Sequence, residues 1–304
     1  MTENSKSKVG AYFQVLRCHQ WLKSGFVLAP LLFSGEFTDL SKCGISLLAC
    51  ISFCAVSSGI YAFNDLCDRK EDQQHLQKRD RPIAKGLVST REAAVFCGVL
   101  ILGGLILGTP LGGRFITILF IYITINAMYS LGLKHVAILD VMIISSGFVL
   151  RILGGSMAIE VVASHWLILC TLMISLFLGF AKRRVEIVTA GKEKESSRIV
   201  LKDYSLAFLD QVISMVTGAT ILCYALYSVD EQTFEQFGTR GMLITVPFVM
   251  YGLFRYLYLV YHRQEGEDAT RACLRDVPMI INLILWVVFS LWVVGYGHTI
   301  SGFF

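Results

Sequence analysis

Charge is scarce in this sequence, and so is proline. Only 16% of the 304 residues carry a charge, against about 25% in a typical soluble domain. The five prolines are scattered, and no Pro- or Ser-rich stretch divides the chain, so we predict a single domain over residues 1–304. The N-terminus, Met1–Gly10, is polar and carries no cleavable signal pattern before the first apolar stretch.

Paired cysteines are also missing. The nine cysteines form no Cys-x-x-Cys pair, and no set of His and Cys residues has metal-ligand spacing. The sequence therefore offers no site for a soft metal. Most of the cysteines lie in apolar runs, where we expect them to be small buried hydrophobic residues.

What the sequence does have is long apolar runs. Hydrophobic residues make up 55% of the chain, and runs long enough to cross about 30 Å of hydrocarbon recur along it. The sequence therefore predicts an all-α, polytopic membrane protein with a nine-helix bundle, in which the first span is short and interrupted by Pro30. The predicted spans are 20–37, 41–66, 91–108, 112–132, 136–158, 162–183, 208–227, 241–262 and 277–300.

Positive charge alternates between the predicted loops. Seven Lys or Arg residues lie in 67–91 and seven more in 182–202, whereas the alternate loops hold only Lys42, Arg114 and Arg240. By the positive-inside rule, the N-terminus is cytoplasmic and the C-terminus is outside. Topology accounts for most of the net charge of +4, so we expect no nucleic-acid partner.

Acidic residues gather where the second apolar run ends. Each ionisable group near hydrocarbon costs about 2.5–3.5 kcal/mol on insertion scales, so such groups usually carry function. Asn64, Asp68 and Asp72 recur every four residues, which predicts one shared helix face, with Asp65 about 100° round. Hard oxygen ligands suit Mg²⁺, with Mn²⁺ as a substitute, held together with substrate phosphates. We therefore predict Asn64, Asp68 and Asp72 as metal ligands; the alternative is a polar helix end that dips into water.

A basic segment follows within ten residues. Lys78, Arg79 and Arg81 offer point-charge and bidentate donors to phosphate oxygens. Alone they would indicate an ordinary cytoplasmic loop. Beside a row of carboxylates they favour a site with metal on one side of a diphosphate and guanidinium on the other.

Two further clusters lie on later helices. Asp140 and Arg151 are eleven residues apart, so they share a helix face about 16 Å apart along the axis. Arg151 is then near the middle of the bilayer and must face the bundle interior, where its partner is a carboxylate, a hydroxyl or a lipid phosphate. A buried structural ion pair is the alternative. The basic cluster Lys182-Arg183, with Glu186, ends the sixth predicted helix.

The signature Asn64-Asp65-x-x-Asp68-x-x-x-Asp72, in a nine-helix membrane protein, resembles the UbiA-type intramembrane prenyltransferase superfamily. Finer details are similar to one group within it, the decaprenyl-phosphate phosphoribosyltransferases. Those details are Arg17–Lys23 with Ala29–Phe33, Tyr129-Ser130 with Lys134 and Asp140, Ser146–Arg151, and Lys182-Arg183 with Glu186.

The resemblance implies a reaction and a set of site residues. Those enzymes join phosphoribosyl pyrophosphate to a polyprenyl (deca- or undecaprenyl) phosphate at the cytoplasmic face of the bacterial inner membrane, and we expect the lipid bilayer and a second copy of the chain as further partners. The implied catalytic residues are Asp65, Asp68, Asp72 and Asp140. The implied substrate-binding residues are Lys23, Asn64, Lys78, Arg79, Arg81, Tyr129, Lys134, Arg151, Lys182, Arg183 and Glu186.

This sequence departs from the group at two positions. Cys18 stands where proline is expected, and Val277 stands where an arginine is usual, so the loop around Asp276 is not assigned to the site. Superfamily members with aromatic acceptors carry a second acid-rich signature after the sixth helix. Here that loop has Glu186, Glu193, Glu195 and Asp203 without such an array, and it carries seven Lys or Arg. Phosphoribosyl pyrophosphate carries a 5-phosphate that a prenyl diphosphate lacks, and the Lys and Arg residues of this loop fit that additional phosphate.

Two alternatives stay open. One is prenyl transfer from a prenyl diphosphate to an aromatic or other small acceptor. The other is a transporter, which would also carry intramembrane charges but usually shows internal repeats and helices broken near the midplane. The acids here cluster at one membrane face and no repeat is visible, which favours an enzyme.

Overall fold

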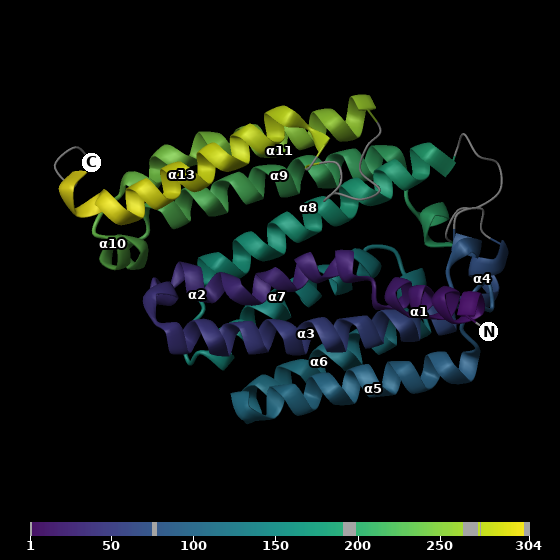
Figure 1. Ribbon diagram of the computed structural model, residues 1–304. Helices are drawn as coiled ribbons and strands as arrows, with labels where there is room; N and C mark the ends of the chain where they lie inside the picture. Colours follow the sequence, from purple (N-terminus) through teal and green to yellow (C-terminus); the bar gives the residue numbers. More distant parts are fainter. Residues whose placement is uncertain (1, 75–77, 191–198, 264–272, 274, 301–304) are drawn as a thin grey trace. The chain divides into compact units, whose positions relative to one another are not determined.

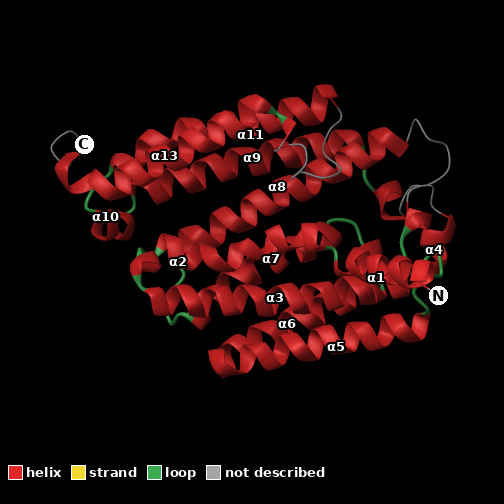
Figure 2. Ribbon diagram, in the orientation of Figure 1, coloured by secondary structure: helices red, strands yellow, loops and turns green. Residues whose placement is uncertain are grey.

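The computed structural model describes residues 2–74, 78–190, 199–263, 273 and 275–300. Within these ranges all regular structure is helical and no strand occurs, as Figure 2 shows, so the all-α prediction is confirmed. The chain divides into two compact units, Met1–Ala163 and Ser164–Phe304, which are described separately below.

The first unit is built around one long central helix, α3 (Leu40–Cys67), which packs against α5, α6, α7 and the N-terminal segment (Figure 1). This unit contains α-helices and 3₁₀ helices, the latter labelled η. In chain order they are α1 (Thr2–Leu16), η1 (Cys18–Leu28), α2 (Ala29–Phe33), η2 (Glu36–Thr38), α3, α4 (Arg69–Gln74), η3 (Lys78–Asp80), α5 (Thr90–Gly108), η4 (Thr109–Leu111), α6 (Gly113–Leu131), η5 (Leu133–His135) and α7 (Leu139–Ala158).

The second unit packs α8 against α9 and α11 against α13. Arg184 Nε donates to Asp210 Oδ1 at 2.6 Å, and Arg255 pairs with Asp276 through two hydrogen bonds of 3.0 and 2.9 Å, so ion pairs join these helices. The elements are α8 (His165–Ala190), η6 (Ile199–Asp203), α9 (Leu206–Val229), α10 (Glu231–Phe237), η7 (Gly241–Thr245), α11 (Val246–Tyr258), the π-helix η8 (Leu259–Arg263) and α13 (Val277–Ile300).

Seven helical segments of the described chain are long and apolar enough to cross a membrane, and they match seven of the predicted spans. An eighth match is α13, which is apolar over Val277–Val293. The seven are Leu40–Cys67, Thr90–Leu111, Gly113–Leu131, Leu139–Ala158, His165–Thr189, Leu206–Val229 and Gly241–His262.

The first predicted span, 20–37, forms η1 followed by α2 instead of one α-helix. The 3₁₀ conformation rises about 2.0 Å per residue against 1.5 Å in an α-helix, so the two elements together reach about 30 Å. Both elements pack against α3 and α7.

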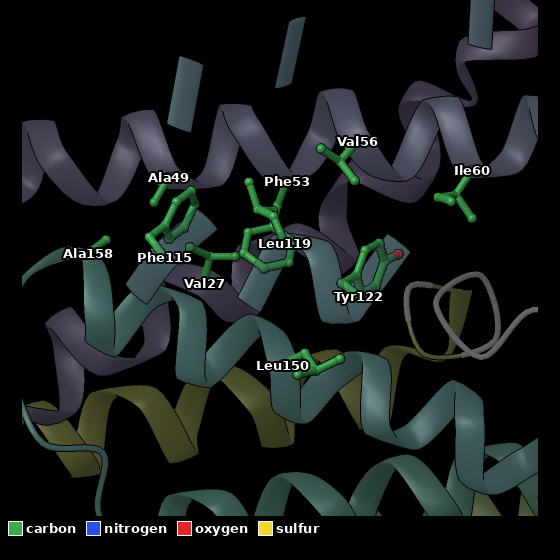
Figure 3. Close-up of a cluster of buried hydrophobic side chains, with 10 residues drawn as sticks. All are labelled: Val27, Ala49, Phe53, Val56, Ile60, Phe115, Leu119, Tyr122, Leu150 and Ala158. Atoms are coloured by element: carbon green, nitrogen blue, oxygen red, sulfur yellow. The ribbon is translucent and has the colours of Figure 1, made fainter. Parts of the chain in front are cut away.

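The core of the first unit contains aromatic rings between α3 and α6. Phe53 lies edge-on to Phe115 and to Tyr122, with ring centroids 5.7 and 5.6 Å apart, and all three side chains are buried (Figure 3). The outward face of α5, by contrast, exposes Val95 and Ile106. An apolar surface of this kind is what a lipid-facing helix presents.

Small residues allow the helices of this unit to approach closely. Ser52 Oγ donates to the Gly104 carbonyl at 2.7 Å, which joins α3 to α5. A Cβ built on Gly104 would lie 2.6 Å from Val56 Cγ2 and 2.9 Å from the Ser52 carbonyl oxygen. On α7, a Cβ at Gly155 would lie 2.0 Å from the Val27 carbonyl oxygen. Glycines at such contacts are typical of packed membrane helices.

The neighbouring glycines of α5 provide a matched test. We expect Gly104→Ala to lower thermal stability in detergent, because the added methyl group overpacks the α3 contact at a cost of about 1–3 kcal/mol. Gly103, one residue earlier, has nothing within 4 Å of its Cβ position, so Gly103→Ala should be neutral or stabilising through helix propensity. Equal melting temperatures for the two variants would contradict this packing.

The length of α3 positions the acidic segment. Asp39 caps its start by accepting from the backbone N–H of Ser41 at 2.8 Å. Its 28 residues then extend about 42 Å, which exceeds the hydrocarbon thickness of about 30 Å. The last turn, with Asn64 and Asp65, therefore reaches the polar edge of the membrane.

Candidate active site

The acidic segment begins on α3 and continues through α4. Asp68 is the C-cap of α3, and the backbone follows a nearly continuous helical path, with Asp68 N–H donating to Asn64 O at 2.9 Å and Asp72 N–H to Asp68 O at 2.8 Å. Asp65 and Asp72 are both only 3% exposed. Buried carboxylates require partners, and the partners of Asp65, Asp68 and Asp72 form two groups.

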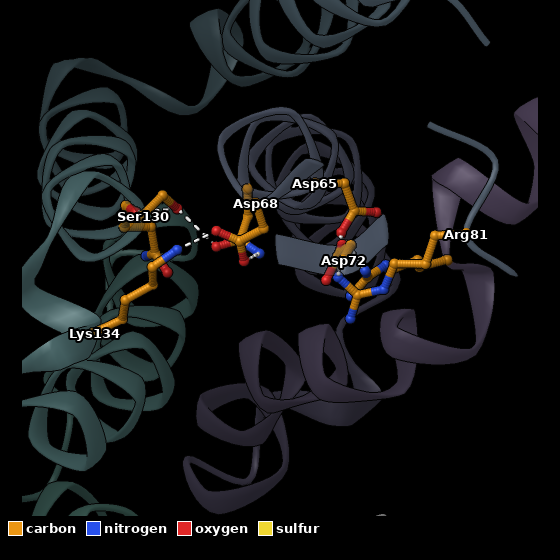
Figure 4. Close-up of polar contacts among 9 residues, drawn as sticks. Asp65, Asp68, Asp72, Arg81, Ser130 and Lys134 are labelled. Carbon is orange, nitrogen blue, oxygen red and sulfur yellow. Dashed lines mark hydrogen bonds and ion pairs between the residues drawn. The ribbon is translucent and has the colours of Figure 1, made fainter. Parts of the chain in front are cut away.

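The first group surrounds Asp68. Asn64 Nδ2 donates to Asp68 Oδ2 at 3.0 Å, and the Lys134 ammonium pairs with Asp68 Oδ1. Ser130 Oγ donates to Asn64 Oδ1 at 3.2 Å. Figure 4 shows Ser130 and Lys134 on the side of Asp68. Lys134 lies in η5 and Ser130 in the last turn of α6, so the connection between α6 and α7 carries a cation to the end of α3.

The second group surrounds Asp65 and Asp72. Arg81 Nη1 donates to Asp65 Oδ1 at 2.9 Å and to Asp72 Oδ2 at 2.7 Å (Figure 4). Arg17 Nη2, from the junction between α1 and η1, donates to the same Asp65 Oδ1 at 2.6 Å. Ile83, fully buried against Ala62 of α3, anchors the loop that carries Arg81.

These contacts correct the predicted sharing of faces. The sequence pattern put Asp72 on the same face as Asn64 and Asp68. An α-helix turns about 100° per residue, so Asn64 and Asp72, eight residues apart, point about 80° away from each other, whereas Asp65 and Asp72, seven residues apart, differ by only about 20°. Asp72 accordingly shares Arg81 with Asp65 and not with Asp68. The assignment of Asn64, Asp68 and Asp72 as metal ligands stays a prediction.

The two groups are electrically balanced. Three carboxylates (Asp65, Asp68 and Asp72) face three cations (Arg17, Arg81 and Lys134). Burial raises the pKa of the Asp72 carboxyl, and the Arg81 guanidinium opposes that rise. Each of the three carboxylates therefore has a cation as its partner.

Arg151 faces the interior of the first unit, as predicted, and of the three kinds of partner named above it has a hydroxyl, that of Tyr122. Its guanidinium donates to Tyr122 Oη at 2.9 Å and to the Gly147 carbonyl at 2.8 Å, and it lies 4.9 Å from the centre of the Tyr122 ring. Its Nε is buried without a hydrogen-bond partner among the described residues. Its assignment to substrate binding stays a prediction.

The other predicted site residues are divided between the units. In the first unit Asp140 is fully buried at the start of α7, Lys23, Lys78 and Tyr129 are half-buried, and Arg79 is exposed. In the second unit Arg183 Nη1 donates to Glu186 Oε2 at 2.6 Å, Arg183 is 2% exposed, and Lys182 is half-buried.

Sequence reasoning missed two residues of the site as functional candidates. Ser130 lies beside Tyr129, and Arg17 begins the stretch that carried the resemblance, so both were within reach of the motifs. No periodicity links position 17 to position 65, however. Only tertiary packing reveals that contact.

The donor set at the end of α3 fits a hard divalent cation. The described residues contain no group of three or more His, Cys, Asp or Glu side chains placed to hold a metal together. Mg²⁺, however, is usually held by one or two carboxylates plus phosphate and water oxygens. Asp68, Asp72 and the amide of Asn64 satisfy that requirement in number and in chemistry.

A membrane-embedded helical bundle with this acidic segment defines a class of intramembrane transferase. The chain belongs to the UbiA prenyltransferase family, whose pattern it matches over residues 25–284. It is thus a multi-pass membrane protein and a transferase, and the predicted resemblance is confirmed.

Two relatives of this chain within the family carry the same enzyme name. The decaprenyl-phosphate phosphoribosyltransferase of Mycolicibacterium smegmatis is 30% identical over 293 residues, covering 93% of this chain and 92% of the relative. The enzyme of the same name from Corynebacterium glutamicum is 30% identical over 288 residues, covering 93% and 86%. Among solved structures, a UbiA homolog from Archaeoglobus fulgidus bound to GPP and Mg²⁺ superposes with a TM-score of 0.66 at 18% identity, covering 96% of this chain and 99% of the homolog, which shows a common fold.

Proposed function

We propose that this protein transfers the 5-phosphoribosyl group of phosphoribosyl pyrophosphate to a polyprenyl phosphate and releases pyrophosphate. The observation that carries the proposal is the similarity, along 93% of the chain, to relatives named for this transfer. The three cations gathered at the end of α3 support it, because both substrates bring phosphate groups to one site.

The proposed reaction requires little proton transfer. The acceptor is a phosphate monoester, whose second pKa is about 6, so it is mostly ionised at neutral pH and needs no strong general base. Its oxygen forms a bond to the anomeric carbon of ribose as the bond from that carbon to pyrophosphate breaks. Catalysis then depends on positioning and on stabilising charge, which Arg81 and Lys134 are placed to supply.

Asn64, Asp68 and Asp72 are the residues that would hold Mg²⁺, with Mn²⁺ as a substitute. When bound, the cation would neutralise charge on the pyrophosphate leaving group. Lys134 pairs with Asp68, and Arg81 pairs with Asp72. Lys182 and Arg183 are proposed as cations for a substrate phosphate, with Glu186 as the partner of Arg183. Residues 1–304 are proposed to form one transferase domain, which the family match over residues 25–284 supports.

The site is proposed to face the cytoplasm, where charged sugar phosphates are made. In a cysteine-free background, we expect Arg114→Cys, at the exposed start of α6, to react with a membrane-impermeant maleimide added to intact cells. Lys85→Cys, in the exposed loop before α5, should react only after the membrane is opened. The reverse pattern would contradict the charge-based topology and the proposed access to the donor.

Prenyl transfer to a small acceptor is the second candidate, because the Archaeoglobus fulgidus homolog is described as bound to GPP and Mg²⁺. To separate the two, purified protein in vesicles is incubated with ribose-labelled phosphoribosyl pyrophosphate, with and without polyprenyl phosphate. Label that enters the organic phase only with the lipid phosphate supports phosphoribosyl transfer.

A parallel incubation supplies a prenyl diphosphate and measures pyrophosphate release. Release that needs an aromatic acceptor and not polyprenyl phosphate, with no ribose label in the lipid, would overturn the proposed donor in favour of prenyl transfer.

A further inference from the structure

Arg17 occupies a backbone conformation that an arginine rarely adopts. Its φ and ψ are 50° and 49°, in the left-handed region, at the junction where α1 ends and η1 begins. Glycine accepts this conformation without cost, whereas other residues pay on the order of 1–2 kcal/mol. Strained residues of this kind cluster where the side chain has a function to perform.

The neighbouring contacts hold this junction against α3. Trp21 Nε1 donates to Ser58 Oγ at 2.9 Å, and Ser58 Oγ donates to the Leu16 carbonyl at 2.8 Å. The turn is therefore fixed on both sides of Arg17. The guanidinium is directed at Asp65 as a consequence, with its carbon also 5.3 Å from the centre of the Tyr61 ring.

Asp65 accepts from two guanidinium groups through a single oxygen. Arg17 Nη2 and Arg81 Nη1 lie 2.6 and 2.9 Å from Asp65 Oδ1. The carboxylate is 4% exposed, whereas the Arg17 and Arg81 side chains remain 20% and 25% exposed. A guanidinium has five N–H donors, and among the described residues Arg17 and Arg81 each use one nitrogen to bind these carboxylates, so other N–H groups remain for a ligand.

We propose that Arg17 is a diphosphate-binding residue of this site, and that Asp65 is a positioning residue that holds Arg17 and Arg81 side by side and does not bind the metal. The proposal deepens the proposed function and rests on it for the location of the donor. Two guanidinium groups that bind one buried carboxylate oxygen lie close together. A guanidinium is a planar fork of N–H donors that can bind phosphate oxygens in bidentate fashion. Asp68 and Asp72, which pair with Lys134 and Arg81, stay the proposed ligands of the cation.

The test measures binding of inorganic pyrophosphate with Mg²⁺ to the purified protein by titration calorimetry, without a lipid acceptor. Arg17→Asn removes the guanidinium but keeps a residue that tolerates the left-handed conformation. We expect the dissociation constant to rise about ten- to hundredfold, the loss of one charge-assisted contact, and Arg17→Lys to recover part of it. Lys8→Gln, on the same α1 with a side chain 55% exposed, is the matched control and should change little.

Two further measurements address Asp65. Free Mn²⁺, followed by electron paramagnetic resonance, should bind Asp65→Asn within about threefold of the unaltered protein, whereas Asp68→Asn binds it at least tenfold more weakly. In the Asp65→Asn background, Arg17→Asn should weaken pyrophosphate binding less than it does alone, because the guanidinium is no longer held in place.

Three outcomes would overturn the proposal. They are unchanged pyrophosphate affinity in folded Arg17→Asn, strictly additive effects of the Arg17 and Asp65 substitutions, or loss of Mn²⁺ affinity in Asp65→Asn equal to that in Asp68→Asn. Pyrophosphate is part of both candidate donors, so this test keeps its meaning if phosphoribosyl transfer is not the reaction.

Discussion

Replacing Asp68 with asparagine is expected to lower the rate of transfer about a hundred- to a thousandfold while the protein stays folded. The carboxylate is the proposed ligand of a cation whose stabilisation of the departing pyrophosphate is worth several kcal/mol, and each 1.4 kcal/mol is about tenfold in rate. Asp68 is also the partner of Lys134. In Asp68→Asn the Lys134 ammonium loses this carboxylate and can pair with the substrate phosphates instead. Initial rates at saturating Mg²⁺ measure the effect.

Asp80→Asn is the matched control for that variant. Asp80 lies in the same basic segment but is 63% exposed, and it pairs with Lys85, which is itself 51% exposed. Exposed pairs of this kind contribute about 0–1 kcal/mol, so its rate should stay within about threefold of the unaltered protein. Normal turnover in Asp68→Asn, or equal losses in the two variants, would remove Asp68 from the metal site.

Arg81→Gln is expected to damage both stability and activity. Arg81 pairs with the buried Asp72 carboxylate. Removal of one member of a buried ion pair lowers the free energy of unfolding by about 3–5 kcal/mol. The partial exposure of Arg81 places the expected loss near the lower end, about 3 kcal/mol. Chemical unfolding in detergent measures that loss, and the transfer assay measures the accompanying loss of phosphate binding.

A second substitution separates the two effects of Arg81→Gln. The double variant Arg81→Gln/Asp72→Asn has no unpaired carboxylate at position 72, so it should unfold at a higher denaturant concentration than Arg81→Gln alone, yet remain inactive. Lys85→Gln, in the same loop, should leave stability within about 0.5 kcal/mol of the unaltered protein. If the double variant were less stable than the single one, Asp72 would not depend on Arg81 for its charge.

The membrane class and most of the helices could be predicted because their causes are local. An apolar run of twenty residues must form a helix in hydrocarbon, whatever lies beside it, since no water satisfies its backbone groups. Thus α3, α5, α6, α7, α8, α9 and α13 appear where the sequence predicted spans. The conformation of residues 20–37 could not be predicted from local sequence, because the 3₁₀ geometry of η1 depends on its packing against α3 and α7.

The sequence by itself determined that this is a helical membrane protein with an acidic and a basic segment at one membrane face, because composition and short-range spacing dictate both. Only the tertiary structure decided how those charges pair. Lys134 meets Asp68 across 66 positions and Arg17 meets Asp65 across 48, and each pairing follows from how α1, α3 and α6 pack. Ion pairs are set by distance in space, and no spacing along the chain encodes such distances.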